Sequence, residues 1–166
     1  MSIKLFYPAT FLPHKNHHFL RDKEIIQFLE NENIKIILTI EKKDLKIESD
    51  SFSFIGRVSH HTCLSIMRDS SAIIFLSSYE SLGLPILEAS FNKKSIIVPD
   101  LNYSREIIGN NGYFLKSPLS KDNTLNVLKK FKNDYIKGIN KIAKLKSKNI
   151  VSSNKLIQIF MKELNL

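Results

Sequence analysis

Residues 72–89 read AIIFLSSYESLGLPILEA, which is an apolar run, a polar loop and a second apolar stretch that opens with a glycine and a proline. The run Ala72–Leu76 is typical of a buried strand, because it is short, uninterrupted and rich in isoleucine. Proline is tolerated in the first turn of a helix, so a helix is predicted from about Leu84 through Phe91. A strand, a loop and a helix in this order are the repeating unit of an α/β fold with a parallel sheet.

Short apolar runs alternate with longer amphipathic stretches on both sides of this segment. A helix is predicted over His18–Asn31, a second helix is capped by Ser59, and a short third one is capped by Ser104 and stops near Gly109. Further strands are predicted at Ile3–Tyr7, Ile34–Ile40, Phe52–Ile55, Ser95–Val98 and Tyr113–Leu115. The predicted fold class is therefore α/β, a Rossmann-like, doubly wound parallel sheet of about six strands with C-terminal helices. Ligands of such folds bind at the carboxyl ends of the strands.

The pattern after Pro118 is helical only. A length of 166 residues is within the usual size range of one domain. We therefore expect a single domain over residues 1–166, with an α/β core at 1–118 and a basic helical segment at 119–166. Three apolar helix faces are predicted in that segment, formed by Leu125, Leu128, Phe131 and Tyr135, by Ile139, Ile142 and Leu145, and by Leu156, Ile159 and Phe160.

The composition, with 43% hydrophobic and 25% charged residues, is that of an ordinary soluble globular protein. No stretch approaches the roughly 18 apolar residues that a membrane-spanning helix needs. Met1 leads straight into an apolar run without the basic region and cleavage site of a signal peptide. The lone cysteine, Cys63, has no partner for an internal disulfide, which fits a reducing cytoplasm.

The net charge of +9 comes entirely from the last third of the chain. Residues 1–115 hold 13 basic and 13 acidic side chains, whereas residues 116–166 hold 12 lysines and three acidic side chains. A basic helical segment of this kind fits a solvated face in a lysine-rich protein, or a surface that meets anionic lipid. Nucleic acid is disfavoured as a partner, because the segment has no arginine and few aromatic side chains.

The loop and helix of the opening segment carry the candidate chemistry. The N–H groups of Gly83 and Leu84, together with the helix dipole, are expected to hold a phosphate group. Glu88, one turn into the helix, is expected to accept hydrogen bonds from two vicinal ribose hydroxyls, and Glu80 to lie on the sugar side of the phosphates. The spacing alone also fits a reading in which Glu88 is an exposed helix residue.

This segment resembles the E-x7-E signature of retaining family-4 glycosyltransferases of the GT-B fold, with Glu80 and Glu88 as its two carboxylates. The run FIGRV at 54–58 is similar to the strand and loop that lie beside the nucleobase in that family. Residues 97–100, 105–108 and 111–115 follow the order of the family's last strand, short helix and turn. The resemblance covers roughly residues 3–131.

The resemblance implies transfer of a hexose from a nucleoside diphosphate, with Glu80 and Lys15 as the catalytic residues. The resemblance also implies a first Rossmann-like domain of comparable size that binds the acceptor, and we expect that N-terminal acceptor domain to be absent from this sequence. The ligand it implies is a UDP-sugar donor, and the donor-binding residues it implies are Lys15, Gly56, Arg57, Val58, Glu80, Ser81, Leu82, Gly83, Leu84 and Glu88.

Two positions depart from the family's pattern. Thr10 stands where the family commonly has an arginine that binds the diphosphate, so the charge is expected to fall on Lys15, helped by His14 or Arg105. Ser81 replaces a glycine that often follows the first glutamate.

A metal is not expected to take part. The sequence has no D-x-D pair to bridge a divalent cation and a diphosphate. The adjacent His60 and His61 face different directions on a helix, so a surface or capping role is predicted for them rather than a metal site. No cofactor is expected beyond the donor substrate.

The overall character looks like that of a bacterial enzyme that is cytoplasmic and peripheral at the inner face of the plasma membrane. Among such enzymes the chain is most similar in character to the bacterial cholesterol α-glucosyltransferases, which implies UDP-glucose as donor and a lipid or sterol hydroxyl as acceptor. A glycosyltransferase of capsule or lipopolysaccharide synthesis, with a saccharide acceptor, is the alternative. A nucleotide-binding module that has lost its catalytic activity is the alternative of another class.

Overall fold

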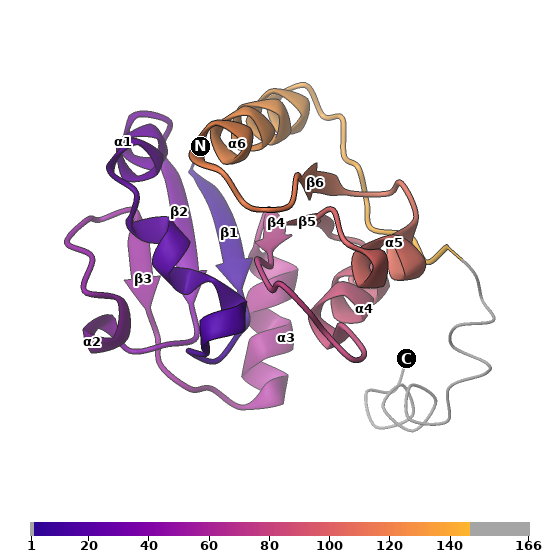
Figure 1. Cartoon of the computed structure of the whole chain (residues 1–166), viewed down its shortest axis with the longest axis horizontal. Helices are drawn as coiled ribbons and strands as arrows, with labels where there is room; N and C mark the ends of the chain where they lie inside the picture. The colour runs from indigo at the N-terminus through magenta and orange to yellow at the C-terminus, as the bar shows by residue number, and fades with distance from the viewer. Residues whose placement is uncertain (1, 147–166) are drawn as a thin grey trace.

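The computed structural model describes residues 2–146, which form one parallel sheet covered by helices (Figure 1). The strand order is β3-β2-β1-β4-β5-β6, and every pair of neighbouring strands is parallel. All six predicted strands are confirmed, with bounds that differ by at most two residues. They are β1 (Ile3–Tyr7), β2 (Ile34–Leu38), β3 (Phe52–Phe54), β4 (Ala72–Ile74), β5 (Ser95–Pro99) and β6 (Tyr113–Leu115).

The sheet is doubly wound, as predicted. The chain moves outward in one direction from β1 to β2 and β3, and in the other from β4 to β5 and β6. Because crossovers between parallel strands are right-handed, α1 (Lys23–Asn31) and α4 (Leu84–Phe91) cover opposite faces of the sheet. Helix α6 (Lys121–Ile136) packs beside α1, and α5 (Asn102–Ile108) packs beside α4 (Figure 1). The loops that leave β1 and β4 therefore diverge and open a crevice at the switch point.

The single helix predicted over His18–Asn31 is wrong. The segment forms a 3₁₀ helix, η2 (His17–Arg21), and then α1, with the chain extended at Asp22 between them. The Asp22 carboxylate accepts hydrogen bonds from the N–H groups of Glu24 and Ile25. The apolar periodicity runs through both elements, but the aspartate caps the second one and so separates it from the first.

Of the two serine caps predicted for other helices, one is confirmed and one is wrong. Ser59 caps α3 (His60–Asp69), as predicted, because its hydroxyl accepts from the N–H of Thr62. Ser104 is not a cap, since it is the third residue of α5 and its hydroxyl donates to the Pro99 carbonyl at 2.6 Å. Two short elements, α2 (Lys42–Leu45) and the 3₁₀ helix η1 (Pro13–Lys15), have no counterpart in the prediction.

The C-terminal segment follows the prediction only as far as α6, which buries Leu128 and Phe131. The helical face predicted at Ile139, Ile142 and Leu145 is wrong, because residues 137–146 are not helical. Their backbone bonds to the core instead: Ile142 bridges Ser95, and Ala143 donates to the Lys94 carbonyl. The third predicted face, at Leu156, Ile159 and Phe160, lies outside the described residues.

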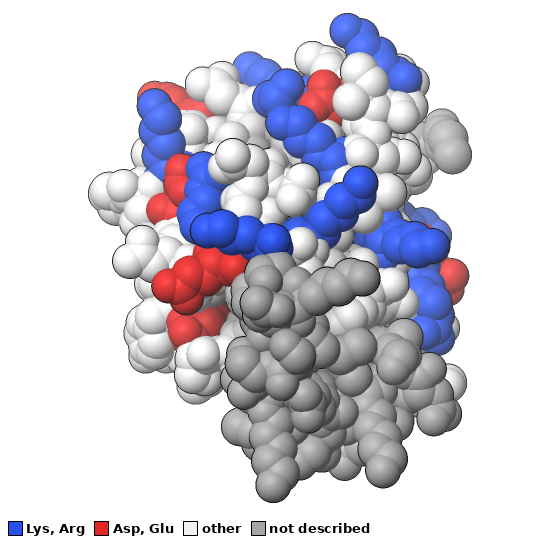
Figure 2. All heavy atoms as spheres, turned by 90° about the vertical axis from the view of Figure 1, so that its right-hand side faces the viewer, with Lys and Arg blue, Asp and Glu red and all other residues white. Residues whose placement is uncertain are grey.

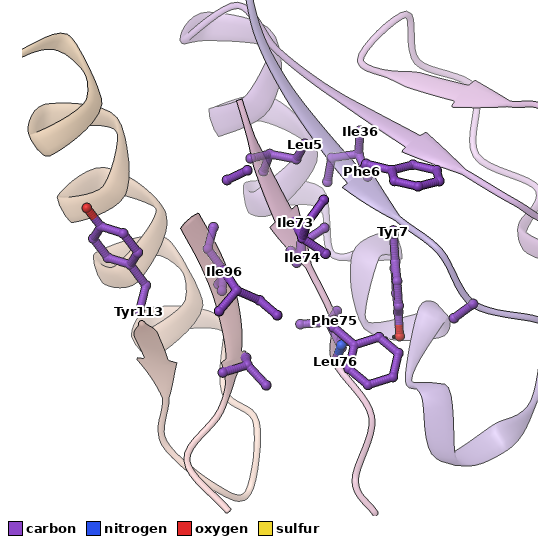
Figure 3. Close-up of a cluster of buried hydrophobic side chains, with 14 of the residues drawn as sticks. Leu5, Phe6, Tyr7, Ile36, Ile73, Ile74, Phe75, Leu76, Ile96 and Tyr113 are labelled. Carbon is purple, nitrogen blue, oxygen red and sulfur yellow. Dashed lines mark hydrogen bonds between the residues drawn. The ribbon is translucent and has the colours of Figure 1, made fainter. Parts of the chain in front are cut away.

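Strands β4 and β5 are buried along their whole length because helices cover both faces of the sheet. Tyr7 is the last residue of β1 and is fully buried in this core (Figure 3). Its ring stacks on that of His17 with centroids 4.4 Å apart, and meets the edge of the Phe75 ring. Its hydroxyl accepts from the N–H of Leu76 at 3.3 Å, the contact dashed in Figure 3, and donates to the carbonyl of Lys15. One buried hydroxyl thus links the end of β4 to η1.

Candidate functional site

The loop after β1 is tied to the loop after β4 by several hydrogen bonds. Besides the Tyr7 hydroxyl, the Asn16 side-chain amide donates to the Leu76 carbonyl at 2.8 Å and to the Ser78 hydroxyl at 2.7 Å. The N–H of Ser78 in turn donates to the carbonyl of His14 at 2.8 Å. These bonds hold η1, which ends at Lys15, against the loop that contains the first glutamate of the sequence signature.

Lys15 and Glu80 meet across this junction. The lysine Nζ donates to Glu80 Oε1, and only 13% and 15% of the two side chains are exposed. The ammonium group also lies 5.0 Å from the centre of the Phe75 ring. Lys15 is therefore a largely buried residue of the site rather than a solvated surface lysine. An ammonium has three N–H donors, so the pair leaves Lys15 able to donate to a second acidic group.

Helix α4 begins at the mouth of the same crevice. Gly83 has φ = +60°, a left-handed conformation that side chains disfavour, and it allows the chain to turn sharply into the helix. The N–H groups of Ile86 and Leu87 donate to the Gly83 carbonyl and form the first hydrogen bonds of the helix. The N–H groups of Gly83 and Leu84 come before these in the chain and have no acceptor within the helix. Two N–H groups and the positive end of the helix dipole are thus available to an anion.

Two adjoining hollows lie along the crevice. The first hollow, of about 340 Å³, lies against the loop before α4 and the first turns of that helix. It is lined by Pro8, Lys15, Cys63, Glu80, Ser81, Leu82, Gly83, Leu84, Pro85 and Glu88. The second, of about 260 Å³, is lined by Pro8, Ala9, Thr10, Thr39, Arg57, Val58, His60 and Cys63. Because Pro8 and Cys63 line both, the two hollows form one elongated cleft at the switch point. A larger hollow of about 480 Å³ lies at the opposite edge of the sheet, where ligands of this fold class do not bind.

Glu88 is 5% exposed and is not an exposed helix residue. Burial raises the pKa of its carboxyl group, and a 2.7 Å hydrogen bond with His60 Nε2 offsets part of that rise. Burial also raises the pKa of the neighbouring Cys63 to about 12, so its thiol is protonated at neutral pH and is a poor nucleophile. The polar group that this part of the cleft offers to a ligand is therefore the buried carboxylate.

Three residues that were predicted to contribute to the donor site do not line either hollow of the cleft. Gly56 does not line either hollow; it turns the loop at φ = +64° and its N–H donates to the Ile40 carbonyl. Arg105 is held by Asp100 through hydrogen bonds of 2.5 and 2.8 Å and lies over the Phe114 ring, so its predicted help to Lys15 is wrong. The ring of His14 stacks on that of Tyr79 at 4.4 Å and likewise lines neither hollow.

His60 is the residue of this site that the sequence prediction missed. The predicted surface position is confirmed, since its side chain is 45% exposed, but its ring also reaches across from α3 to Glu88 on α4, which the sequence did not indicate. The cap at Ser59 could have indicated that His60 begins a helix, but no pattern in the sequence reports how close two helices come. Within residues 2–146 no group of three or more histidine, cysteine or acidic side chains could hold a metal ion. In the same part of the chain no helix has the length and apolar character needed to cross a bilayer.

Comparisons with known proteins identify the family. Residues 2–149 match the family of glycosyl transferases group 1. The search of curated proteins returned no match. Among solved structures, Staphylococcus aureus TarM, in complex with fondaparinux, α-GlcNAc-glycerol and UDP, is similar with a TM-score of 0.71 at 19% identity, over 99% of this chain and 35% of that one.

Two further structures share the fold. Anabaena HepE, in complex with UDP-glucose, has a TM-score of 0.65 at 16% identity, over 98% of this chain and 49% of that one. The catalytic domain of Arabidopsis thaliana starch synthase IV, bound to ADP and acarbose, has a TM-score of 0.71 at 12% identity, over 99% of this chain and 39% of that one. The chain thus spans between about a third and a half of the length of the structures it matches. On the match over residues 2–149, the chain belongs to the glycosyl transferases group 1 family.

Proposed function

We propose that the cleft binds a nucleoside diphosphate sugar and that the chain is the donor-binding half of a retaining family-4 glycosyltransferase of the GT-B fold. The observation that carries this proposal is the meeting of a lysine, two glutamates and a helix N-terminus along one cleft at the switch point of the sheet. No single one of these groups would be specific for such a ligand. Together they offer a counterpart to each part of such a ligand, which are a hexose, a diphosphate and a ribose.

Each part of the donor has a counterpart in the cleft. The diphosphate would lie between Lys15 and the N–H groups at the start of α4. Glu80 would accept hydrogen bonds from hexose hydroxyls, and Glu88 from the two ribose hydroxyls. The nucleobase would then lie in the second hollow beside Arg57 and Val58. We propose that the diphosphate is held by protein groups alone, without a metal or other cofactor.

The proposed reaction transfers the sugar with retention of its anomeric configuration. The bond between the anomeric carbon and the leaving phosphate oxygen breaks, and the acceptor hydroxyl oxygen bonds to that carbon on the same face. The acceptor proton passes to the leaving phosphate, so no side chain has to act as the base. Negative charge builds on the diphosphate during this step, where Lys15 and the first turn of α4 would stabilise it.

We propose UDP-glucose as the donor. HepE was solved with UDP-glucose and TarM with UDP, whereas starch synthase IV was solved with ADP, so the shared fold accommodates more than one base. The second hollow offers no charged carboxylate to select a purine amino group. Competition between UDP, ADP and GDP is therefore part of the test.

We propose a lipid or sterol hydroxyl as the acceptor, and a location that is cytoplasmic and peripheral at the inner face of the plasma membrane. The support is charge: residues 116–146 hold nine lysines and two aspartates. Figure 2 shows many lysine and arginine side chains on one face of the molecule, with acidic side chains interspersed among them. Such a surface is attracted to anionic lipid. Cholesterol is the narrower choice of acceptor, and it rests on the resemblance in overall character rather than on a motif.

The acceptor would bind to a further domain, in keeping with the greater length of the similar structures. A transferase of capsule or lipopolysaccharide synthesis would use the same donor cleft with a saccharide acceptor, and its acceptor domain would distinguish it. A catalytically inactive nucleotide-binding module would also bind UDP. An assay of glucose transfer by the full-length protein separates the enzyme from such a module.

Titration calorimetry of the chain with UDP, UDP-glucose, GDP and ADP, in the absence of metal, tests the donor site. UDP should bind, and Glu88→Ala should weaken that binding about 10- to 100-fold, because a charged hydrogen-bond acceptor is lost. Glu106→Ala is the matched control, since Glu106 is an exposed glutamate on α5 away from the cleft lining. Equal UDP affinities in the two variants would contradict the proposed role of Glu88, and stronger binding of GDP or ADP would contradict the choice of base.

A further inference from the structure

The contact between His60 and Glu88 joins two helices that are consecutive in the chain but belong to different strand connections. His60 is the first residue of α3, fixed by the Ser59 cap, and Glu88 lies in the middle of α4. The distance of 2.7 Å between His60 Nε2 and Glu88 Oε1 is that of a charge-assisted hydrogen bond. An ionised carboxylate that is 5% exposed is costly unless such bonds compensate for its lost hydration.

The pair also stands at the junction of the two hollows. Glu88 lines the hollow that contains Lys15 and Glu80, and His60 lines the one that contains Arg57 and Val58. A ribose that connects a base in one hollow to a diphosphate in the other has to pass this junction. A carboxylate has about four acceptor sites, so a single bond from His60 leaves enough of them for two ribose hydroxyls.

We propose that His60 is a positioning residue that holds the Glu88 carboxylate in the orientation and ionisation state required to accept both ribose hydroxyls of the nucleotide. This inference rests on the proposed donor site and adds a residue to it that the family resemblance did not supply. His60 acts through Glu88 and thereby sets the selectivity of the site for ribose over deoxygenated sugars.

Other ionisable groups that face this carboxylate must be included in any pH dependence. Cys63 lies on α3 beside it, and its pKa is itself raised by burial and by the charge of Glu88. Lys15 from η1 and Glu80 from the loop after β4 line the same hollow. Because Lys15 and Glu80 form an ion pair with each other, their charges largely cancel at the distance of Glu88. His60 is thus the donor on which the ionised state of Glu88 depends most directly.

The test compares UDP with 2′,3′-dideoxy-UDP by titration calorimetry for wild type, His60→Ala and His60→Gln, at pH 6 and pH 8. Glutamine places an amide N–H near the position of the histidine Nε2 and does not titrate. His61→Ala is the matched control, because His61 is exposed and points in a different direction on the same helix. We expect wild type to prefer UDP by about tenfold or more, as two hydroxyl bonds to a charged acceptor imply.

In His60→Ala that preference should fall to within about twofold at pH 6 and should be larger at pH 8, because burial raises the pKa of the Glu88 carboxyl group and acid therefore favours its neutral form. His60→Gln and His61→Ala should keep the preference of wild type. Equal losses of affinity for both nucleotides in His60→Ala, with an unchanged preference at both pH values, would overturn the positioning role. If wild type itself failed to distinguish the two nucleotides, the proposed ribose contact would fail first, so the two failures are distinguishable.

Discussion

The two halves of the cleft are built in different ways. The half proposed to bind the phosphates, called the phosphate half, comprises Lys15, Glu80 and the backbone of Gly83 and Leu84, and its two charged side chains already pair with each other. The half proposed to bind the nucleoside, called the nucleoside half (Arg57, Val58, His60 and Glu88), is assembled from side chains of separate connections, around one buried carboxylate. The comparison teaches that the first half depends on the charge of one lysine and on the hydrogen bonds that hold its loop, whereas the second depends on the packing of two helices.

Replacement of the lysine should have the largest effect and should affect the phosphate half alone. Lys15→Met should weaken binding of UDP by about 2–3 kcal/mol, because a charge-assisted bond is lost and Glu80 is left without its partner. Uridine, which lacks phosphates, should bind both proteins equally. Calorimetry with both ligands measures the difference, with Lys137→Met at the end of α6 as control. An equal loss for uridine would mean that the two halves are not independent.

Acidification should lower the free energy of unfolding through His17, which packs against Tyr7 next to the phosphate half. His17 is buried, neither ring nitrogen has a hydrogen-bond partner among residues 2–146, and burial lowers its pKa from 6.5 to about 4. Between these pH values the unfolded chain binds the proton and the folded chain does not, so stability falls as the pH falls from 6.5 to 4. The loss should reach about 2–3 kcal/mol.

Urea unfolding at pH 7.5, 5.5 and 4.5 measures this pH dependence. His17→Phe should flatten it, because the aromatic stack on Tyr7 is kept without a titrating group. His18→Phe should not, since His18 is exposed. If both variants lost stability with acid as steeply as wild type, the titration of His17 would not be the cause.

Removal of one hydroxyl should loosen the phosphate half from the core. Tyr7→Phe leaves the Lys15 carbonyl and the Leu76 N–H unpaired in a buried site, which should cost about 1–2 kcal/mol of unfolding free energy. UDP affinity should fall further than uridine affinity. Tyr113→Phe provides the comparison, because that hydroxyl bonds the side chain of Asp134 and neither residue lines the cleft. Chemical denaturation and calorimetry together test this; a Tyr7→Phe protein with wild-type stability would contradict it.

The smallest effect is expected at the entrance to α4. A Cβ on Gly83 would lie 2.8 Å from Ile107 Cδ1, whereas a Cβ on Gly138 would meet nothing within 4 Å, and both glycines have positive φ. Both Gly83→Ala and Gly138→Ala therefore place a side chain on a backbone with positive φ. Only Gly83→Ala also creates a steric conflict, which is with Ile107. Gly83→Ala should be the less stable by about 1 kcal/mol in thermal or urea unfolding. Equal stabilities would show that Ile107 moves aside at no cost.

Much of the fold could be predicted because parallel strands covered on both faces are uniformly apolar. The six strands were readable mainly for that reason, whereas the cap at Ser59 and the helix with Pro85 in its first turn were readable from local residue preferences. The errors occurred where particular hydrogen bonds, rather than the apolar pattern, decided the conformation. Residues 137–146 have a helical apolar pattern, yet their backbone bonds to Lys94 and Ile107 in the core. Asp22 divided a predicted helix because its side chain replaced the helical bonds of two N–H groups.

The residues of the candidate site also separate into those that the sequence predicted and those that only the folded structure brought together. The sequence by itself determined the start of α4 and the loop before it. A glycine, a proline and two glutamates at fixed spacing act there through local backbone geometry. Only the tertiary structure decided that Lys15 pairs with Glu80, that Arg105 turns away to Asp100, and that His60 reaches Glu88. The physical reason is that a hydrogen bond requires its partners to approach within about 3 Å. The distances between elements come from the packing of the whole core, which spacing along the chain does not report.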